Sequence, residues 1–267
     1  MLKQCTEIWE LVDKKRPLVH CITNYVTVND VANILLSAGA SPAMIDHPEE
    51  AEGFAALASA LYVNLGTLSQ QQQAGIMVAC KTTAANNIPV ILDPVACGVV
   101  PFRVQVMKQM RQYAPLTLIK GNTAEIKSLA GEETRAQGVD SLDSGEGMEQ
   151  ICMNLARQES TIIASTGPTD VITDGRRCAL VKNGTPLFEK ITGAGCMVGG
   201  VTAACIGAAP EEPWLATITG LLAFTLAGER AAADADNRPG AFHLHLFDHL
   251  YTLKKEDLLK EARVEWL

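Results

Sequence analysis

The sequence has few charged residues, few aromatic residues and no regular cysteine pattern. Only 19% of its 267 residues are charged and 5% are aromatic, whereas 48% are hydrophobic. The eight cysteines include no C-x-x-C pair, which predicts reduced thiols of a cytoplasmic protein rather than a disulfide scaffold. The net charge of −8 gives no overall attraction to nucleic acid or anionic membranes, so we expect neither as a partner.

Common catalytic and membrane signals are also missing. The sequence contains no Walker A motif, no protein-kinase motif set and no Rossmann glycine fingerprint after the first predicted strand. Residues 1–20 are charged and lack an apolar core, so we expect an amphipathic helix there rather than a signal peptide. The uncharged segments 191–210 and 213–228 are predicted to be buried helices, because the first is rich in Gly, Ala and Thr and the second is short.

Short apolar runs alternate with longer helical patterns along the chain. The runs at 17–23, 41–45, 61–65, 89–93, 116–120 and 161–165 are predicted strands, and 29–38, 48–60, 69–87, 102–113 and 145–159 are predicted helices. This alternation is typical of successive βαβ units and predicts a mainly parallel sheet with helices on both faces. With no linker or repeat, residues 1–267 are expected to form a single α/β domain.

Beyond residue 166 the pattern changes. Asp174, Gly175 and Arg176 predict a hairpin turn between strands at 170–174 and 177–181, and the chain from Gly195 onward is predicted to be helical. The polar segment 131–145 is the best candidate for a mobile loop, but a solvated connection without a function is the alternative that we favour. Low charge and many alanines in the helices predict burial on more than one side or in a subunit interface.

Four polar or glycine-rich groups follow predicted strands, where open parallel sheets bind their ligands: 93–95, 120–125, 165–167 and 192–196. The last is a Gly-rich turn before a helix, which predicts free backbone N–H groups and an anion site. Cys196 would lie in the first turn, where the helix dipole is expected to lower the pKa of its thiol. Alternatively, the glycines allow only a tight turn and Cys196 is a small buried hydrophobe.

Asn122 and Glu125 have the spacing of a helix-capping box. Alternatively, Glu125 and Asp93, from a neighbouring strand end, organise the Mg²⁺ that ATP-dependent phosphoryl transfer requires. Lys120 either meets a phosphate or is simply solvated. His245 and His249 lie one helical turn apart, but the apolar residues between them favour a packed helix over a metal site.

The order of Asp93, Asn122-x-x-Glu125, Thr166-Gly167 and the glycine turn before Cys196 resembles the ribokinase-like superfamily of small-molecule kinases. The segments 22–33, 39–44, 64–68 and 239–242 are similar, more specifically, to the hydroxyethylthiazole kinase family of thiamine salvage. The likeness extends from about residue 17 to the C-terminal helix. Cys196 supports the narrower resemblance, because the superfamily usually has Asp there and the thiazole kinases have Cys.

The resemblance implies a three-layer αβα sandwich, ribokinase-like, that phosphorylates the hydroxyl of 4-methyl-5-(2-hydroxyethyl)thiazole with ATP and Mg²⁺. It implies a homotrimer with the thiazole alcohol bound between subunits. In that family, Cys196 would act as the base, and Met44, Gly193 and the Asn24 segment would bind the thiazole. Lys120 and Thr166 would bind ATP. Asp93 and Glu125 would bind the metal and the phosphate.

Two positions depart from the family pattern. The loop after Asp93 contains less glycine than the family's version, and Ala194 stands where Thr is common. Two other functions stay open: a hydroxymethylpyrimidine or sugar kinase of the same superfamily, and a thiazole-binding regulatory protein on a degenerate kinase fold. The segment from Asn24 to Met44 and Cys196 argue against the former. Retention of Asp93, Glu125 and the anion site argues against the latter.

Overall fold

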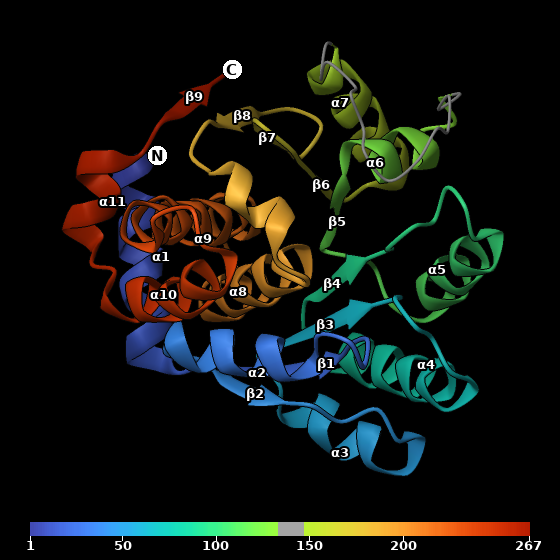
Figure 1. The fold of residues 1–267 in the computed structure, drawn as a ribbon. Helices are drawn as coiled ribbons and strands as arrows, with labels where there is room; N and C mark the ends of the chain where they lie inside the picture. Colours follow the sequence, from blue (N-terminus) through green and yellow to red (C-terminus); the bar gives the residue numbers. More distant parts are fainter. Residues whose placement is uncertain (133–146) are drawn as a thin grey trace.

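The alternating sequence pattern folds into one sheet between two helical layers, as a computed structural model shows for residues 1–132 and 147–267 (Figure 1). The segment 131–145, the candidate for a mobile loop, lies almost wholly outside the described residues. The strands are β1 (Leu18–Ile22), β2 (Ser41–Ala43), β3 (Ala60–Asn64), β4 (Val90–Asp93), β5 (Leu118–Asn122), β6 (Ile162–Thr166), β7 (Asp170–Thr173), β8 (Cys178–Val181) and β9 (Val264–Trp266).

Within the described part of the chain, these strands form one sheet in the order β2-β1-β3-β4-β5-β6-β7-β8-β9. The pairs from β2 to β6 are parallel, and β7, β8 and β9 continue the sheet in antiparallel pairs. The chain leaves β1 toward β2 on one side and then returns to β3 on the other. The strand order therefore reverses between β1 and β3, and such a switch point is where open α/β sheets bind ligands.

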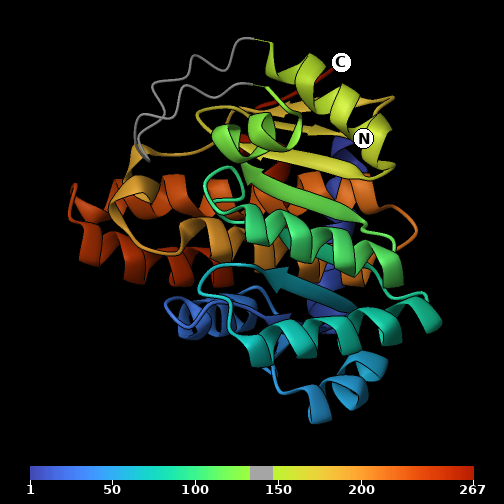
Figure 2. The same cartoon turned by 90° about the vertical axis from the view of Figure 1, so that its right-hand side faces the viewer.

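Helices cover both faces of the sheet (Figures 1 and 2). One layer contains α1 (Leu2–Lys15), α2 (Val28–Ser37), α8 (Ala194–Ala208), α9 (Pro213–Ala235), α10 (Pro239–Thr252) and α11 (Lys255–Glu261). The other contains α3 (Pro48–Leu57), α4 (Gln70–Ala85), α5 (Pro101–Tyr113), α6 (Thr123–Leu129) and α7 (Met148–Glu159). A short 3₁₀ helix, η1 (Pro186–Lys190), precedes α8. The predicted three-layer αβα sandwich is confirmed.

Each central strand contributes to two hydrophobic cores. In β3, Ala60 and Tyr62 pack in the core beneath α8 and α9, whereas Leu61 and Val63 pack beneath α3 to α5. Since successive side chains of a strand point to opposite faces, a strand covered on both sides must be apolar throughout. This requirement explains the continuous apolar runs in the sequence.

The uncharged segments of the sequence form α8 and α9 in the middle of one layer. Helix α9 is buried at every position from Trp214 to Gly228, because α1, α8, α10 and the sheet surround it. None of the helices in residues 1–132 and 147–267 combines the length and hydropathy that a bilayer span requires. The apolar, charge-poor composition of these segments therefore reflects burial in the protein core.

The predicted strands agree with the observed ones to within two residues, and the hairpin of β7 and β8 is present. The prediction that the chain is helical from Gly195 onward is wrong at its end, where β9 pairs with β8. Only three residues form β9, and its position depends on distant partners: Trp266 packs against Trp214 with ring centroids 5.9 Å apart. A strand so short and so dependent on tertiary contacts leaves no periodic signal in the sequence.

Candidate active site

A buried ion pair lies at the carboxyl edge of the sheet. Lys120 Nζ, near the end of β5, lies 2.9 Å from Asp93 Oδ2 at the end of β4, and both side chains are almost inaccessible to solvent. The same ammonium donates to the Gly195 carbonyl at 2.9 Å. Burial alone would lower the pKa of Lys120, but the Asp93 carboxylate raises it, so the ammonium stays charged. Lys120 is thus a buried cation, not a solvated side chain.

Tyr62 connects this ion pair to helix α8. Its hydroxyl lies 3.4 Å from Asp93 Oδ2 and donates to the Cys196 carbonyl at 3.1 Å. Burial and the nearby Asp93 raise the pKa of Tyr62 well above its usual range, so the phenol remains neutral. The first turn of α8 is therefore attached to the sheet by Tyr62 and Lys120.

Helix α8 begins at an open turn that fits an anion. Gly193 is its N-cap residue with φ of +87°, in the left-handed region, and no side chain caps the helix or places an acid in its first turn. Unpaired backbone N–H groups at such a terminus favour negative charge. The glycine turn thus leaves the first N–H groups of α8 without a side-chain cap, and Cys196 lies in the first turn of this helix.

Two asparagines contact the Cys196 sulfur. Asn24 follows β1 and Asn64 ends β3, on the two sides of the switch point, and each donates from Nδ2 to Cys196 Sγ at 3.3 Å. Asn24 Nδ2 also donates to Asn64 Oδ1 at 3.0 Å. The sequence analysis singled out Asn24 and Cys196, but it included Asn64 only in the family-like segment 64–68 and gave it no chemical role.

The expectation that the pKa of Cys196 is lowered is wrong. Burial and the Asp93 carboxylate raise it, while the side chains of Thr27 and Asn24 and the charge of Lys120 act in the opposite direction. The sequence-based expectation considered only the local helix dipole. It missed the desolvation and the carboxylate, which come from residues far away in the sequence.

Glu125 forms the predicted capping box at the start of α6. Glu125 N donates to Asn122 Oδ1 at 2.9 Å, and Glu125 Oε2 accepts from Asn122 N at 2.8 Å. Its other oxygen, Oε1, accepts from Ala96 N at 2.7 Å in the loop after β4. Burial and the nearby Asp93 raise the pKa of Glu125, which indicates that the two carboxylates repel each other.

The Asp93 and Glu125 carboxylates are oxygen ligands of the type that Mg²⁺ prefers. No group of three or more His, Cys, Asp or Glu side chains among the described residues has the arrangement of a complete metal site. Mg²⁺ needs no such group, since one or two carboxylates together with phosphate oxygens and water commonly hold it. A cation near Asp93 and Glu125 would relieve their mutual repulsion.

Thr166 lies at the end of β6, paired in register with Asn122 of β5, and its hydroxyl donates to the Gly121 carbonyl at 3.3 Å. The turn that follows is held by Asp170, whose buried Oδ1 accepts from Gly167 N at 3.0 Å. Burial raises the pKa of Asp170 to about 7. The sequence analysis named Thr166 as a candidate site residue but did not name Asp170. Asp170 belongs to no recognisable motif, and its contribution is the hydrogen bond that holds the turn.

Met44 lies outside the hydrogen-bonded cluster. It follows the edge strand β2 and is half-buried against the core beneath α8. Gly193, in contrast, closely approaches Thr27 at the start of α2: a Cβ on Gly193 would lie 2.7 Å from Thr27 Cγ2. The structure thus brings Asn24, Gly193 and Cys196 together, whereas Met44 lies just beyond the end of the edge strand β2.

The histidines of α10 have other partners. His249 Nε2 lies 2.8 Å from Asp234 Oδ2, and the ring centroids of His245 and His249 are 6.5 Å apart.

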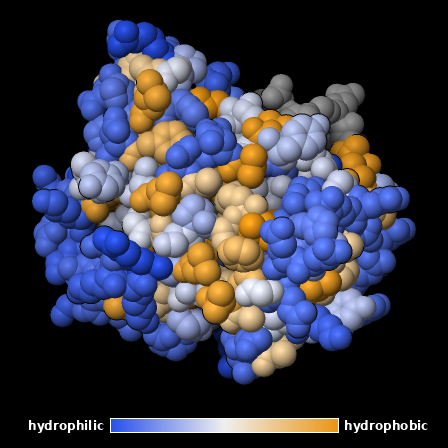
Figure 3. Space-filling view, turned by 90° about the horizontal axis from the view of Figure 1, so that it is seen from below, coloured by the Kyte–Doolittle hydropathy of each residue, from blue (hydrophilic) through white to orange (hydrophobic). Residues whose placement is uncertain are grey.

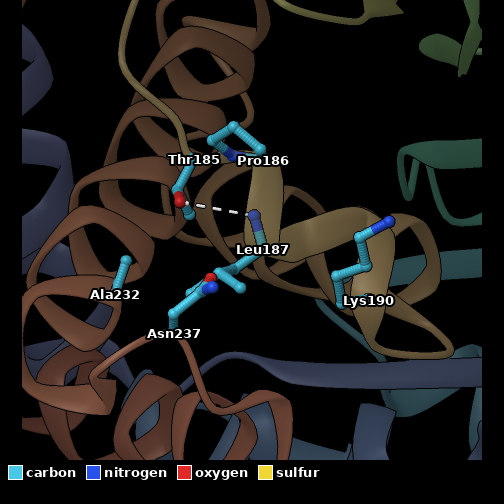
Figure 4. Close-up of a pocket in the computed structure, with 6 residues that line it drawn as sticks. All are labelled: Thr185, Pro186, Leu187, Lys190, Ala232 and Asn237. Carbon is cyan, nitrogen blue, oxygen red and sulfur yellow. Dashed lines mark hydrogen bonds between the residues drawn. The ribbon is translucent and has the colours of Figure 1, made fainter.

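Two surface hollows lie away from this candidate site. One, of about 320 Å³, is lined by η1 and the end of α9, including Lys190 and Asn237 (Figure 4). The other, of about 810 Å³, lies between α1 and the end of α10.

Comparisons with known proteins identify the family. The sequence profile of the hydroxyethylthiazole kinase family matches residues 9–256. The chain belongs to the hydroxyethylthiazole kinase family. It is 59% identical to "Hydroxyethylthiazole kinase" of Syntrophomonas wolfei, over the full length of both chains. The resemblance inferred from the sequence motifs is confirmed, and the chain is an enzyme that acts as a kinase.

Solved structures support the same fold. The structure of hydroxyethylthiazole kinase protein from Pyrococcus horikoshii superposes with a TM-score of 0.91 at 37% identity, covering 99% of each chain. A ribokinase-like superfamily protein from Enterococcus faecalis superposes with a TM-score of 0.64 at 10% identity, covering 92% of this chain and 95% of that one. At so low an identity the likeness concerns the fold alone, and it confirms the ribokinase-like architecture.

We predict that Lys120→Met destabilises the protein by about 3–5 kcal/mol, because it leaves the Asp93 carboxylate buried without its cation. Urea unfolding measures the change. The matched control is Lys182→Met, which breaks the half-exposed pair with Glu265 and should change stability by about 0–1 kcal/mol. Equal, small losses in the two variants would contradict the structural importance of the buried pair.

Proposed function

We propose that the protein transfers the γ-phosphoryl group of ATP to the hydroxyl of 4-methyl-5-(2-hydroxyethyl)thiazole in a cytoplasmic thiamine pathway. The observation that carries this proposal is the meeting of three features at one sheet edge. They are the buried Lys120 cation, the uncapped start of α8 and the Cys196 thiol. The Lys120 cation and the uncapped helix start can bind a phosphate, and the Cys196 thiol can serve as the base that an attacking hydroxyl needs.

The nucleotide is proposed to lie along β5, β6 and the start of α8. Lys120 and the α8 amides would stabilise charge on the transferred phosphoryl group, and Thr166 would contact ATP beside the turn held by Asp170. Asp93 and Glu125 would hold Mg²⁺, directly or through water, and the ion would screen the phosphate charges. These contacts position the γ-phosphorus in front of the first turn of α8.

The thiazole alcohol is proposed to lie on the other side of that turn, against Gly193, the Asn24 segment and Met44. Its hydroxyl would face Cys196, which takes the hydroxyl proton as the alcohol oxygen bonds to the γ-phosphorus. The bond from that phosphorus to the bridging oxygen breaks, and ADP leaves. Phosphoryl transfer depends mainly on positioning and charge stabilisation, so the base contributes less than the anion site.

The active species is proposed to be a homotrimer with substrate sites between subunits. Several apolar side chains are exposed next to the substrate segment or on the neighbouring helices. They include Tyr25, Val26, Leu36, Leu57, Leu244 and Tyr251. Figure 3 shows apolar side chains running across the middle of the molecular face seen from below. Contact with a second copy would cover them and enclose the site.

We expect purified protein with ATP and Mg²⁺ to release ADP when hydroxyethylthiazole is supplied, and far less with hydroxymethylpyrimidine or ribose. A coupled ADP assay with each alcohol offered separately measures this. ADP release with hydroxymethylpyrimidine or ribose instead would identify another ribokinase-like activity. Tight thiazole binding without ADP release would favour a regulatory, non-enzymatic protein.

Cys196→Ala is expected to lower turnover by roughly ten- to a thousand-fold without abolishing it, the range expected for a general base that assists a reaction. Cys196→Asp should retain substantial turnover, because its carboxylate can accept the same proton. The matched control is Cys205→Ala, a buried thiol near the other end of the same helix. A fully active Cys196→Ala enzyme would reduce Cys196 to a packing residue.

Light scattering is expected to give three times the chain mass of 28.5 kDa. Leu36→Asp, which replaces an exposed leucine of α2 with a charged residue, should yield smaller species with reduced turnover. Tyr113→Asp is the control, since this half-exposed residue lies at the end of α5 in the opposite layer. A fully active monomer would overturn the trimer proposal.

A further inference from the structure

The orientation of the Asn64 side chain is fixed by its partners. Its Oδ1 accepts from Gly66 N at 3.0 Å and from Asn24 Nδ2 at 3.0 Å. Backbone N–H groups can only donate, so the atom facing Gly66 must be the amide oxygen. The amide nitrogen therefore points the other way, toward Cys196 Sγ at 3.3 Å and the Tyr62 hydroxyl at 3.4 Å.

Asn24 is fixed in the same way. Its Oδ1 accepts from Thr27 N at 3.1 Å, which leaves Nδ2 to donate to Cys196 Sγ at 3.3 Å and to Asn64. Both asparagines are buried, with 5% and 2% of their surfaces exposed for Asn24 and Asn64. The Cys196 sulfur thus receives two N–H donors whose directions are set by backbone groups.

Thr27 supplies a third polar group at the same place. Its buried Oγ1 has no hydrogen-bond partner among the described residues, and the Thr27 side chain lowers the pKa of the Cys196 thiol. Neither amide oxygen is directed at the sulfur, because each already accepts from a backbone N–H. The asparagine atoms directed at Cys196 Sγ are therefore donors.

We propose that Asn64 and Asn24 are positioning residues that hold the Cys196 sulfur as a hydrogen-bond acceptor and thereby favour its thiolate. Hydrogen bonds to an ionised acceptor are roughly twice as strong as those between neutral groups, so two fixed donors stabilise the thiolate more than the thiol. The catalytic consequence rests on the proposed kinase function, whereas the effect on the thiol itself does not.

Charged groups from several elements surround this sulfur. Asp93 on β4 opposes the thiolate and Lys120 on β5 favours it. Tyr62 on β3 is neutral, and Asp30 on α2 lies on the Gly193 side of the turn. Burial and Asp93 both disfavour the charged form, and the two amides, together with the Thr27 side chain, are neutral groups that offset them.

The first test is the reaction of Cys196 with iodoacetamide from pH 6 to 11, in protein without nucleotide or thiazole. Mass spectrometry of the peptide containing Cys196 separates its alkylation from that of the seven buried cysteines. We expect Asn64→Leu, a neutral replacement that lacks the donor, to move the alkylation midpoint up by about one to two pH units. Asn33→Leu, at an exposed asparagine of α2, should leave the midpoint unchanged.

A second variant guards against loss of folding. Asn64→Asp keeps an oxygen for Gly66 N and Asn24 Nδ2 but removes the donor to the sulfur, so its network of accepted bonds survives. Its alkylation midpoint should rise at least as far as that of Asn64→Leu, because it adds a negative charge. Unchanged midpoints in both folded variants would overturn the proposal.

Kinetics provide an independent readout. At pH 7 Asn64→Leu should lower kcat roughly tenfold for each pH unit of midpoint shift, with an unchanged KM for ATP and partial recovery of kcat at higher pH. In a Cys196→Asp background the same change should lower kcat less, because that carboxylate is already ionised. A lower kcat with an unmoved alkylation midpoint would overturn the proposal and make Asn64 a structural residue. If no alcohol is phosphorylated, the proposed function fails, while the alkylation comparison still decides the role of the amides.

Discussion

The buried ion pair between Asp93 and Lys120 fixes how the sheet and helix α8 are placed relative to each other. Its ammonium also binds the Gly195 carbonyl, and Tyr62 joins the carboxylate to the Cys196 carbonyl. A buried ion pair adds little net stability, since desolvation opposes the attraction between the charges. What it provides is a fixed cation next to an uncapped helix start, two features that a phosphoryl group requires together.

The close packing of α8 on β3 completes this arrangement. A Cβ at Gly199 would lie 2.4 Å from the Tyr62 hydroxyl, so only glycine allows the helix to approach the strand this closely. Asn64 lies two residues after Tyr62 in β3, on the same face of the strand. The close approach of α8 therefore brings Cys196 into contact with Asn64, and with Asn24 across the switch point. A packing constraint in the helix interior therefore sets the geometry of the thiol at its start.

Local patterns predicted most of the fold because they depend on neighbouring residues. The strands, the β7–β8 hairpin and the capping box of Asn122 and Glu125 follow from apolar runs, turn residues and spacing. The site was predicted in part, through residues at strand ends, because parallel strands bring those ends together. Strand β9, the burial of Lys120 and the contact of Asn64 with Cys196 were not predictable, since each depends on a partner distant in the sequence.

The pKa of Cys196 shows why a cysteine suits this position. Asp93 and Glu125 already repel each other beside a single buried ammonium, as the raised pKa of Glu125 indicates. An aspartate at position 196 would add a third negative charge in the resting protein, whereas a thiol whose pKa is raised by burial and by Asp93 stays neutral there. The thiol can then become charged when the balance of nearby charges shifts. Two fixed amide donors keep that ionisation within reach, so the sulfur combines low charge at rest with readiness to accept a proton.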